Sequence, residues 1–128
     1  MKILVCGDRT WSFPEIIRKT LDLYKTLHEI EIIEGDCTGA DRIAGQWAQQ
    51  HQVPLHVYPA DWSKGLAAGP IRNRQMLTEG QPDLVLAFHD HIVQSKGTKN
   101  MVTQAQKAKI TCILVKSSGE FEVLEATV

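Results

Sequence analysis

With 128 residues, of which 43% are hydrophobic and 23% charged, the chain is long enough for one domain with a core, which we expect to span residues 1–128. Its 14 Lys and Arg against 15 Asp and Glu leave a net charge of −1, which argues against nucleic-acid binding. No apolar run approaches the roughly 20 residues of a membrane span, and the three cysteines follow no paired-motif spacing. We therefore expect a cytoplasmic protein that has no membrane partner and needs neither a metal nor another cofactor.

Apolar runs alternate with segments of helical periodicity along the chain, and they predict strands and helices in turn. The strands are expected at Lys2–Cys6, Ile30–Ile33, Leu55–Tyr58, Pro82–Phe88 and Ile110–Val115, with an edge strand at Phe121–Leu124. The helices are expected to begin at capping or first-turn residues, namely Ser12, Thr38, Pro70 and Thr98. Strands joined by single helices favour an α/β fold with a parallel sheet that is covered on both faces.

The connections that follow the strands differ in composition from those that follow the helices. Glycine, arginine and aspartate gather in the former, together with Trp11 and Trp62, whereas the latter are short and plain. In open α/β sheets, ligands bind beyond the carboxyl ends of the strands, where the strand order reverses. The pattern therefore predicts a ligand site at that end, where either tryptophan can stack on a base or pack in the core. The alternative, that these residues only close loops, explains the glycines but not the excess of Arg and Asp.

A candidate anion site opens the helix that follows the fourth predicted strand, at Ser95, Lys96, Gly97 and Thr98. The start of a helix leaves N–H groups unpaired and carries the positive end of the helix dipole. Gly97 allows a ligand to approach the backbone closely, and Lys96 adds positive charge beside it. We expect a phosphate here. The alternative is a capped helix whose lysines only face water.

Two further turns at the same end of the sheet carry candidate ligand-binding residues. Gly7 leaves room beside the backbone, while Asp8 and Arg9 can contact sugar hydroxyls and phosphate or pair with each other across the turn. A second anion cradle is expected in the loop after the second strand, at Gly35, Asp36, Thr38, Gly39 and Asp41. This loop is not a P-loop, because no Gly-Lys-Ser/Thr follows at the required spacing.

The segment around the third predicted helix contains two arginines. Arg72 and Arg74 stand two apart, so their side chains point in different directions from a helix. One of them can face the ligand while the other pairs with Asp41 or Asp61. Asn73, between them, can donate a hydrogen bond to a base or a ribose.

Five blocks, in this order along nearly the whole chain, resemble the YspA-type branch of the SLOG superfamily: Gly7–Trp11, Glu34–Arg42, Ala60–Trp62, Gly69–Met76 and Ser95–Thr98. That superfamily is similar to the LOG phosphoribohydrolases and to DprA. The resemblance implies a Rossmann-like three-layer α/β/α sandwich with a mainly parallel sheet of about five strands. It also implies a nucleotide or nucleotide-derived ligand, sensed in some members during defence or stress signalling, and a homodimer or a higher homo-oligomer.

The sequence departs from the LOG enzymes at one catalytic position. Their Gly-Gly-x-Gly-Thr turn is followed closely by a glutamate that helps to cleave the N-glycosidic bond, whereas here Lys99, Asn100 and Met101 follow Thr98. Arg74 matches the arginine that those enzymes use beside the sugar. Hydrolysis would therefore need another carboxylate, and Asp41 is our candidate alongside Asp8, Asp36 and Asp61.

The first hypothesis is accordingly a protein that binds a nucleotide-like small molecule, with a sensor role as in some relatives. The second is a nucleotide N-glycosidase or phosphoribohydrolase of LOG type, in which Arg74 and Asp41 take part in catalysis. The third, a DprA-like binder of single-stranded DNA, requires a basic groove, which the net charge of −1 disfavours.

Overall fold

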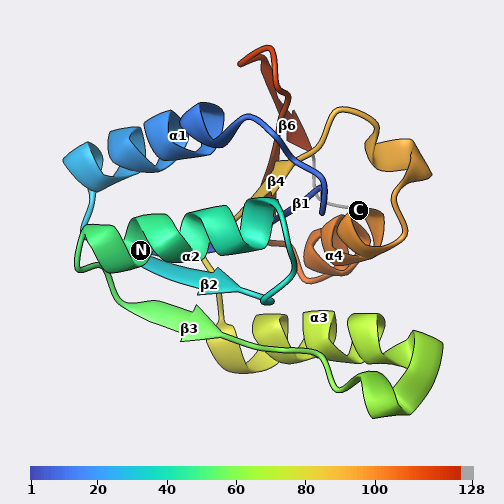
Figure 1. The fold of residues 1–128 in the computed structure, drawn as a ribbon. Helices are drawn as coiled ribbons and strands as arrows, with labels where there is room; N and C mark the ends of the chain where they lie inside the picture. The colour runs from blue at the N-terminus through green and yellow to red at the C-terminus, as the bar shows by residue number, and fades with distance from the viewer. Residues whose placement is uncertain (125–128) are drawn as a thin grey trace.

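In the computed structural model, which describes residues 1–124, a six-stranded sheet lies between two pairs of helices (Figure 1). The strands are β1 (Lys2–Gly7), β2 (Glu31–Glu34), β3 (Leu55–Val57), β4 (Leu84–Phe88), β5 (Thr111–Val115) and β6 (Phe121–Leu124). The helices are α1 (Pro14–Leu27), α2 (Ala40–Gln50), α3 (Ala68–Gly80) and α4 (Gly97–Lys107), with short 3₁₀ segments η1 (Trp62–Ala67) and η2 (Ile92–Gln94). None of the helices among residues 1–124 is both long enough and apolar enough to cross a membrane.

The strand order is β3-β2-β1-β4-β5-β6, with parallel pairing from β3 to β5 and an antiparallel β6 at one edge. This confirms the mainly parallel α/β sandwich and the expected edge strand. The chain moves outward from β1 to β3 and then crosses back to β4, which pairs with β1 from Ile3 opposite Leu84 to Gly7 opposite Phe88. The strand order therefore reverses between β1 and β4, where ligands bind in sheets of this type.

Two apolar layers hold the helices to the sheet. On one face, side chains of α1 and α2 such as Leu21 and Trp47 pack on Ile3 and Val5 of β1. On the other face, Met76 of α3 and residues of α4 pack on the alternate side chains of the same strands. Both faces of β1 and β4 are thus buried, which explains why these strands are continuous apolar runs.

The structure corrects two of the predicted helix starts on the α1–α2 face. No side chain caps α1, which begins at Pro14, so the expected box of Ser12 and Glu15 does not form. No side chain caps α2 either, because its N-cap is Gly39 rather than Thr38. Gly39 has a positive φ of 77°, and a Cβ there would collide with the backbone of Asp8 and Arg9, so only glycine fits at this close approach.

The two helix starts on the other face also differ from the prediction. Helix α3 begins at Ala68, two residues before Pro70. At α4 the N-cap is Lys96, whose side chain makes no capping bond; the Ser95 hydroxyl, one residue earlier, accepts a hydrogen bond from the Thr98 N–H at 3.0 Å, so Ser95 rather than Thr98 supplies an oxygen to the helix start.

Candidate functional site

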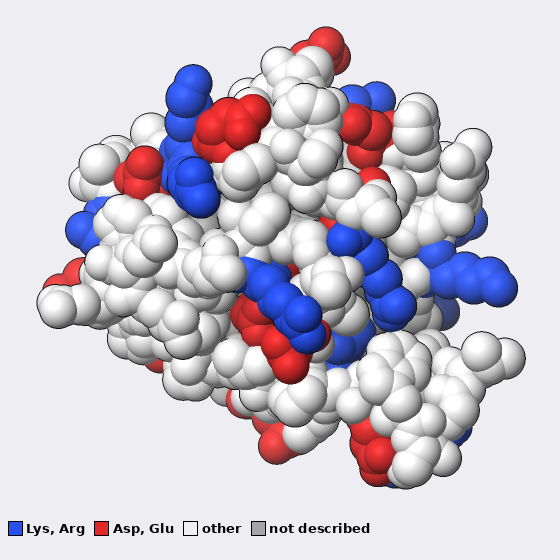
Figure 2. All heavy atoms as spheres, in the orientation of Figure 1, with Lys and Arg blue, Asp and Glu red and all other residues white. Residues whose placement is uncertain are grey.

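A cavity of about 640 Å³ lies at the carboxyl ends of β1 and β4, beside the first turns of α3 and α4. Figure 2 shows Lys and Arg side chains gathered around the hollow in the middle of the face drawn, next to a group of acidic side chains. The residues that line the cavity are Cys6, Gly7, Asp8, Arg9, Cys37, Asp41, Trp62, Leu66, Gly69, Pro70, Arg72, Asn73, Met76, His89, Ser95, Lys96, Gly97, Thr98, Asn100 and Met101. The lining thus combines apolar side chains with charged and amide side chains.

The turn after β1 is held by Asp8, whose carboxylate accepts hydrogen bonds at 2.8 Å from both the N–H and the hydroxyl of Thr10. Burial acts to raise the pKa of Asp8, but these hydrogen bonds outweigh it and lower the pKa, so the carboxylate is charged at neutral pH. Gly7 lies where a Cβ would collide with the Phe88 carbonyl of β4. Gly7 therefore also allows β1 to pack closely against β4, a role that the sequence analysis did not predict.

Arg72 is a buried cation in the wall of the cavity, with 7% of its surface exposed. Its guanidinium donates to the Gly35 carbonyl and to the Asn73 side-chain oxygen, and it contacts the sulfur of Cys37 at 3.7 and 3.8 Å. Arg72 therefore ties α3 to the loop after β2. The sequence allowed either arginine of α3 to face the ligand, and the structure brings Arg72 to the cavity while Arg74 is exposed and outside its lining.

Two buried carboxyl groups lie behind this loop. Asp41, 5% exposed, accepts hydrogen bonds from the N–H groups of Gly35 and Cys37 rather than capping α2 from its first turn. Burial raises the pKa of Asp41 to about 6, and the hydrogen bond from Cys37 and the charge of Arg72 limit the rise. Glu34, 2% exposed, has its pKa raised to about 7 by burial and then by the charge of Asp41.

The floor of the cavity includes the thiol of Cys6, at the end of β1. Burial and then the charge of Asp41 raise the pKa of Cys6 well above its usual range. The thiol is consequently protonated at neutral pH and is not a nucleophile.

At one end of the cavity, the start of α4 presents Lys96 and Gly97, with Thr98 buried beneath them. A Cβ added at Gly97 would meet no atom within 4 Å, so the space beside this residue is open. The Asn73 side chain of α3 donates to the Gly97 carbonyl at 3.3 Å and to the Asn100 side-chain oxygen at 3.1 Å. Asn73 thereby holds the start of α4 in place.

At the mouth of the cavity, Arg9 and Trp62 form a cation–π pair, with the guanidinium carbon 5.5 Å from the centre of the indole. Trp62 is 55% exposed, so its ring is accessible to a ligand. Trp11, by contrast, is 6% exposed and packs edge-on against Phe88 at 5.8 Å. Of the two tryptophans that the sequence offered for stacking, Trp11 belongs to the core and Trp62 to the cavity.

Most of the predicted ligand-binding residues line this one cavity. The predicted residues that line it are Gly7, Asp8, Arg9, Asp41, Arg72, Asn73, Ser95, Lys96, Gly97 and Thr98. The predicted residues that are not part of its lining are Gly35, Asp36, Thr38, Gly39 and Arg74. In the loop after β2, the N–H groups of Gly35 and Cys37 donate to Asp41, and Asp36 pairs with Arg42 at 3.3 Å.

Asn100 is a cavity residue that the sequence-based site did not include. The sequence could have predicted Asn100, because residues three and four apart share one face of a helix. Asn100 follows Gly97 by three residues and Lys96 by four. Met76 and Met101, which pack in the apolar layer beneath α3 and α4, also line the cavity.

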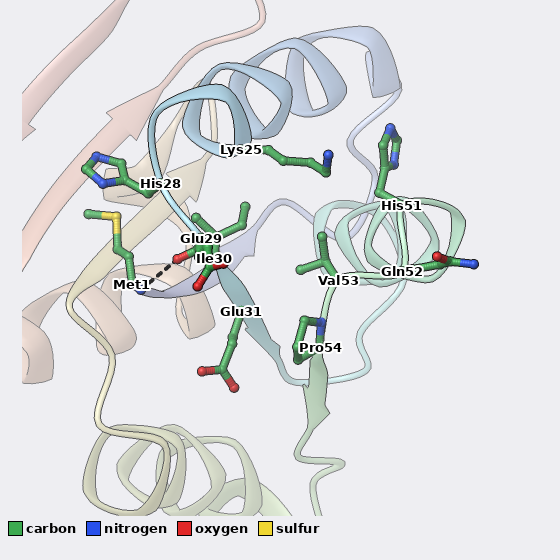
Figure 3. A pocket seen from close by; sticks show the side chains of 10 residues that line it. All are labelled: Met1, Lys25, His28, Glu29, Ile30, Glu31, His51, Gln52, Val53 and Pro54. Carbon is green, nitrogen blue, oxygen red and sulfur yellow. Dashed lines mark hydrogen bonds between the residues drawn. The ribbon is translucent and has the colours of Figure 1, made fainter.

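A second pocket, of about 540 Å³, lies at the opposite end of the sheet, beside Met1 and the C-terminal ends of α1 and α2 (Figure 3). In Figure 3 its side chains Lys25, Glu31 and Gln52 extend in different directions. His51, also in its wall, stacks on Trp47 with ring centres 4.5 Å apart and bonds to the Trp47 carbonyl. Glu31, another residue of the wall, bonds to His56 at 2.8 Å, so both side chains serve local contacts. We take the cavity at β1 and β4 as the better candidate site.

Comparison with known proteins agrees with this fold. The sequence profile of the YspA, cpYpsA-related SLOG family matches residues 1–65. The Gene 61 protein of Mycobacterium phage D29 is 32% identical over 120 residues, which cover 88% of this chain and 94% of the phage protein. The crystal structure of MurG from Acinetobacter baumannii matches 90% of this chain with a TM-score of 0.54 at 9% identity. The match covers 34% of the MurG chain, so it concerns the fold alone. The chain belongs to the YspA, cpYpsA-related SLOG family.

Proposed function

We propose that this protein binds a nucleotide-like ligand, through its phosphoryl group and its base, in the cavity at the carboxyl ends of β1 and β4. The observation that carries the proposal is the pairing of two features in one cavity: the open, Lys96-bearing start of α4 and the accessible ring of Trp62 beside Arg9. Membership of the SLOG family supports the same class of ligand.

Each part of such a ligand has a suitable partner in this cavity. A phosphoryl group is stabilised by the N–H groups and dipole at the start of α4 and by the charge of Lys96. A planar base stacks on the exposed face of Trp62, while Arg9 can form two parallel hydrogen bonds with an oxyanion. The volume of about 640 Å³ is within the usual range for small-molecule sites.

Thermal melting with AMP, ADP-ribose, adenosine and ribose at millimolar concentration tests the proposal. We expect AMP or ADP-ribose to raise the melting temperature by mass action, and ribose to leave it unchanged. Gly97→Val should abolish the shift without unfolding the protein, because the added side chain enters open space beside the cavity. Thr103→Val, an exposed substitution on the same helix, is the matched control and should keep the shift. A complete panel of nucleotides without any shift would contradict the proposal.

A second candidate function is hydrolysis of the N-glycosidic bond of a nucleotide. The observation that favours it is Asp41, a carboxyl group in the cavity wall with a pKa of about 6, which suits proton transfer near neutral pH. Chromatography would detect free base released from nucleoside monophosphates. We expect Asp41→Asn to lose this release while keeping the ligand-induced melting shift, because an amide oxygen can still accept from Gly35 and Cys37. No release of any purine or pyrimidine base from the wild-type protein would leave binding as the function.

A further inference from the structure

The hydrogen bonds of Asn73 determine which way its amide points. Its nitrogen donates to the Gly97 carbonyl at 3.3 Å, and its oxygen accepts from the Arg72 Nε at 3.0 Å. A carbonyl can only accept and a guanidinium can only donate, so the reverse orientation of this amide would lose both bonds.

Gln104, on the next turn of α4 after Asn100, is oriented in the same way. Its amide nitrogen donates to the Pro70 carbonyl at 3.2 Å and to the Asn100 side-chain oxygen at 2.8 Å. Because a carbonyl accepts only, the nitrogen of Gln104 must be the atom that faces both partners.

Asn100 therefore receives two donors at its side-chain oxygen, from Asn73 at 3.1 Å and from Gln104. The amide nitrogen of Asn100 must then point away from them, with two N–H groups to donate. Within residues 1–124 this nitrogen has no protein acceptor. If it were buried it would be a buried polar atom without a partner, and that range contains none, so the nitrogen is accessible. Asn100 lines the cavity, one turn along α4 from Lys96.

We infer that the side-chain amide of Asn100 donates to the phosphoryl group of the ligand and selects for that group, with Asn73 and Gln104 as the positioning residues that prevent the amide from turning over. This inference rests on the proposed nucleotide site and adds which end of the cavity binds the phosphoryl group. The groups that face this end of the cavity from Lys96, from the backbone N–H groups at the start of α4 and from Asn100 are hydrogen-bond donors. This end therefore matches the oxygens of a phosphoryl group, which only accept.

Asn100→Asp is the sharpest test, because it replaces the donating nitrogen with a charged oxygen and leaves the rest of the side chain the same size. One oxygen of the new carboxylate accepts from Asn73 and Gln104 as before, so the unliganded protein should melt at or above the wild-type temperature. The other oxygen replaces the donor with a negatively charged acceptor. By titration calorimetry we expect the affinity for AMP to fall at least about tenfold, while the weaker affinity for adenosine is unchanged.

Two further variants complete the experiment. Gln50→Glu, an exposed change at the end of α2, makes the same change in net charge and should leave AMP binding unchanged. Asn100→Ala leaves Asn73 with the Gly97 carbonyl and Gln104 with the Pro70 carbonyl, so it should fold and bind AMP more weakly than the wild type.

Wild-type affinity for AMP in either Asn100→Asp or Asn100→Ala overturns the role of Asn100 while the nucleotide site stands. A wild-type protein that binds none of the nucleotides overturns both.

Discussion

Among the residues that the structure describes, Glu34 and Asp41 are buried acids, Asp41 in the cavity wall and Glu34 outside its lining, and their protonation links stability to pH. Burial, and for Glu34 also the neighbouring charge of Asp41, raises their pKa values to about 7 and about 6, from ordinary values of 4.5 and 3.8. The folded protein therefore holds these protons at pH values where the unfolded chain has released them. Stability contributed by the two groups is present in acid and is lost as the pH rises to about 7.

We predict that Glu34→Gln raises the free energy of unfolding at pH 8 by about 1–3 kcal/mol, because the folded protein no longer buries a charge there. At pH 5 the variant and the wild type should differ less. Urea denaturation of both proteins at the two pH values measures the difference. An equal effect of the substitution at pH 5 and pH 8 would show that the Glu34 carboxyl group does not titrate in this range.

Arg72 is the residue on which we expect the wall of the cavity to depend most. Arg72→Met should lower the free energy of unfolding by about 2–4 kcal/mol, since the Gly35 carbonyl and the Asn73 oxygen lose a charged donor while buried. Arg74→Met on the exposed side of the same helix is the control, with an effect within about 0.5 kcal/mol. Equal losses in urea denaturation would mean that the buried network contributes nothing beyond an exposed arginine.

At the scale of the elements, different residues hold the starts of α2 and α4 beside the cavity. The start of α2 is held by a backbone hydrogen bond from the Ala40 N–H to the Asp8 carbonyl at 3.2 Å and by the Asp41 carboxylate, which accepts from the loop after β2. The start of α4 is held by side chains, from Ser95 in its own turn and from Asn73 of α3.

Ser95→Ala should lower the stability of the protein by about 1 kcal/mol, because the Thr98 N–H loses its capping oxygen. Ser95→Asp restores an acceptor, and its charge is favourable at the start of a helix, so its melting temperature should match the wild type. The same charge opposes a phosphoryl group, and AMP should bind this variant more weakly. If the melting temperature of Ser95→Ala equals that of the wild type, the hydrogen bond from Thr98 to Ser95 does not contribute to stability.

At the scale of the whole molecule, family membership is the basis for expecting a homo-oligomer. We predict that sedimentation equilibrium gives twice the 14.3 kDa of one chain or more at micromolar concentration. A mass of 14.3 kDa at all concentrations tested would contradict the expectation, and the cavity, whose described lining comes from one chain, would then act within a monomer.

Much of the fold could be predicted because β1 and β4 are buried on both faces and so appear as continuous apolar runs between turn residues. The helix starts were less predictable. Ser12 and Thr38 carry correct local capping patterns, yet neither caps its helix. In the second case the Asp41 carboxylate, which the capping pattern requires, accepts from Gly35 and Cys37 instead. Local signals fail where a more distant or stronger partner takes the same groups.

The sequence by itself determined the alternation of strands and helices, the gathering of Gly, Arg and Asp after the strands, and membership of the family. Only the tertiary structure decided that β1 lies beside β4, that Arg72 rather than Arg74 reaches the cavity, and that the amide of Asn100 is held by Asn73. Periodicity is a local property of the chain, whereas these arrangements depend on hydrogen bonds and packing between segments far apart in sequence.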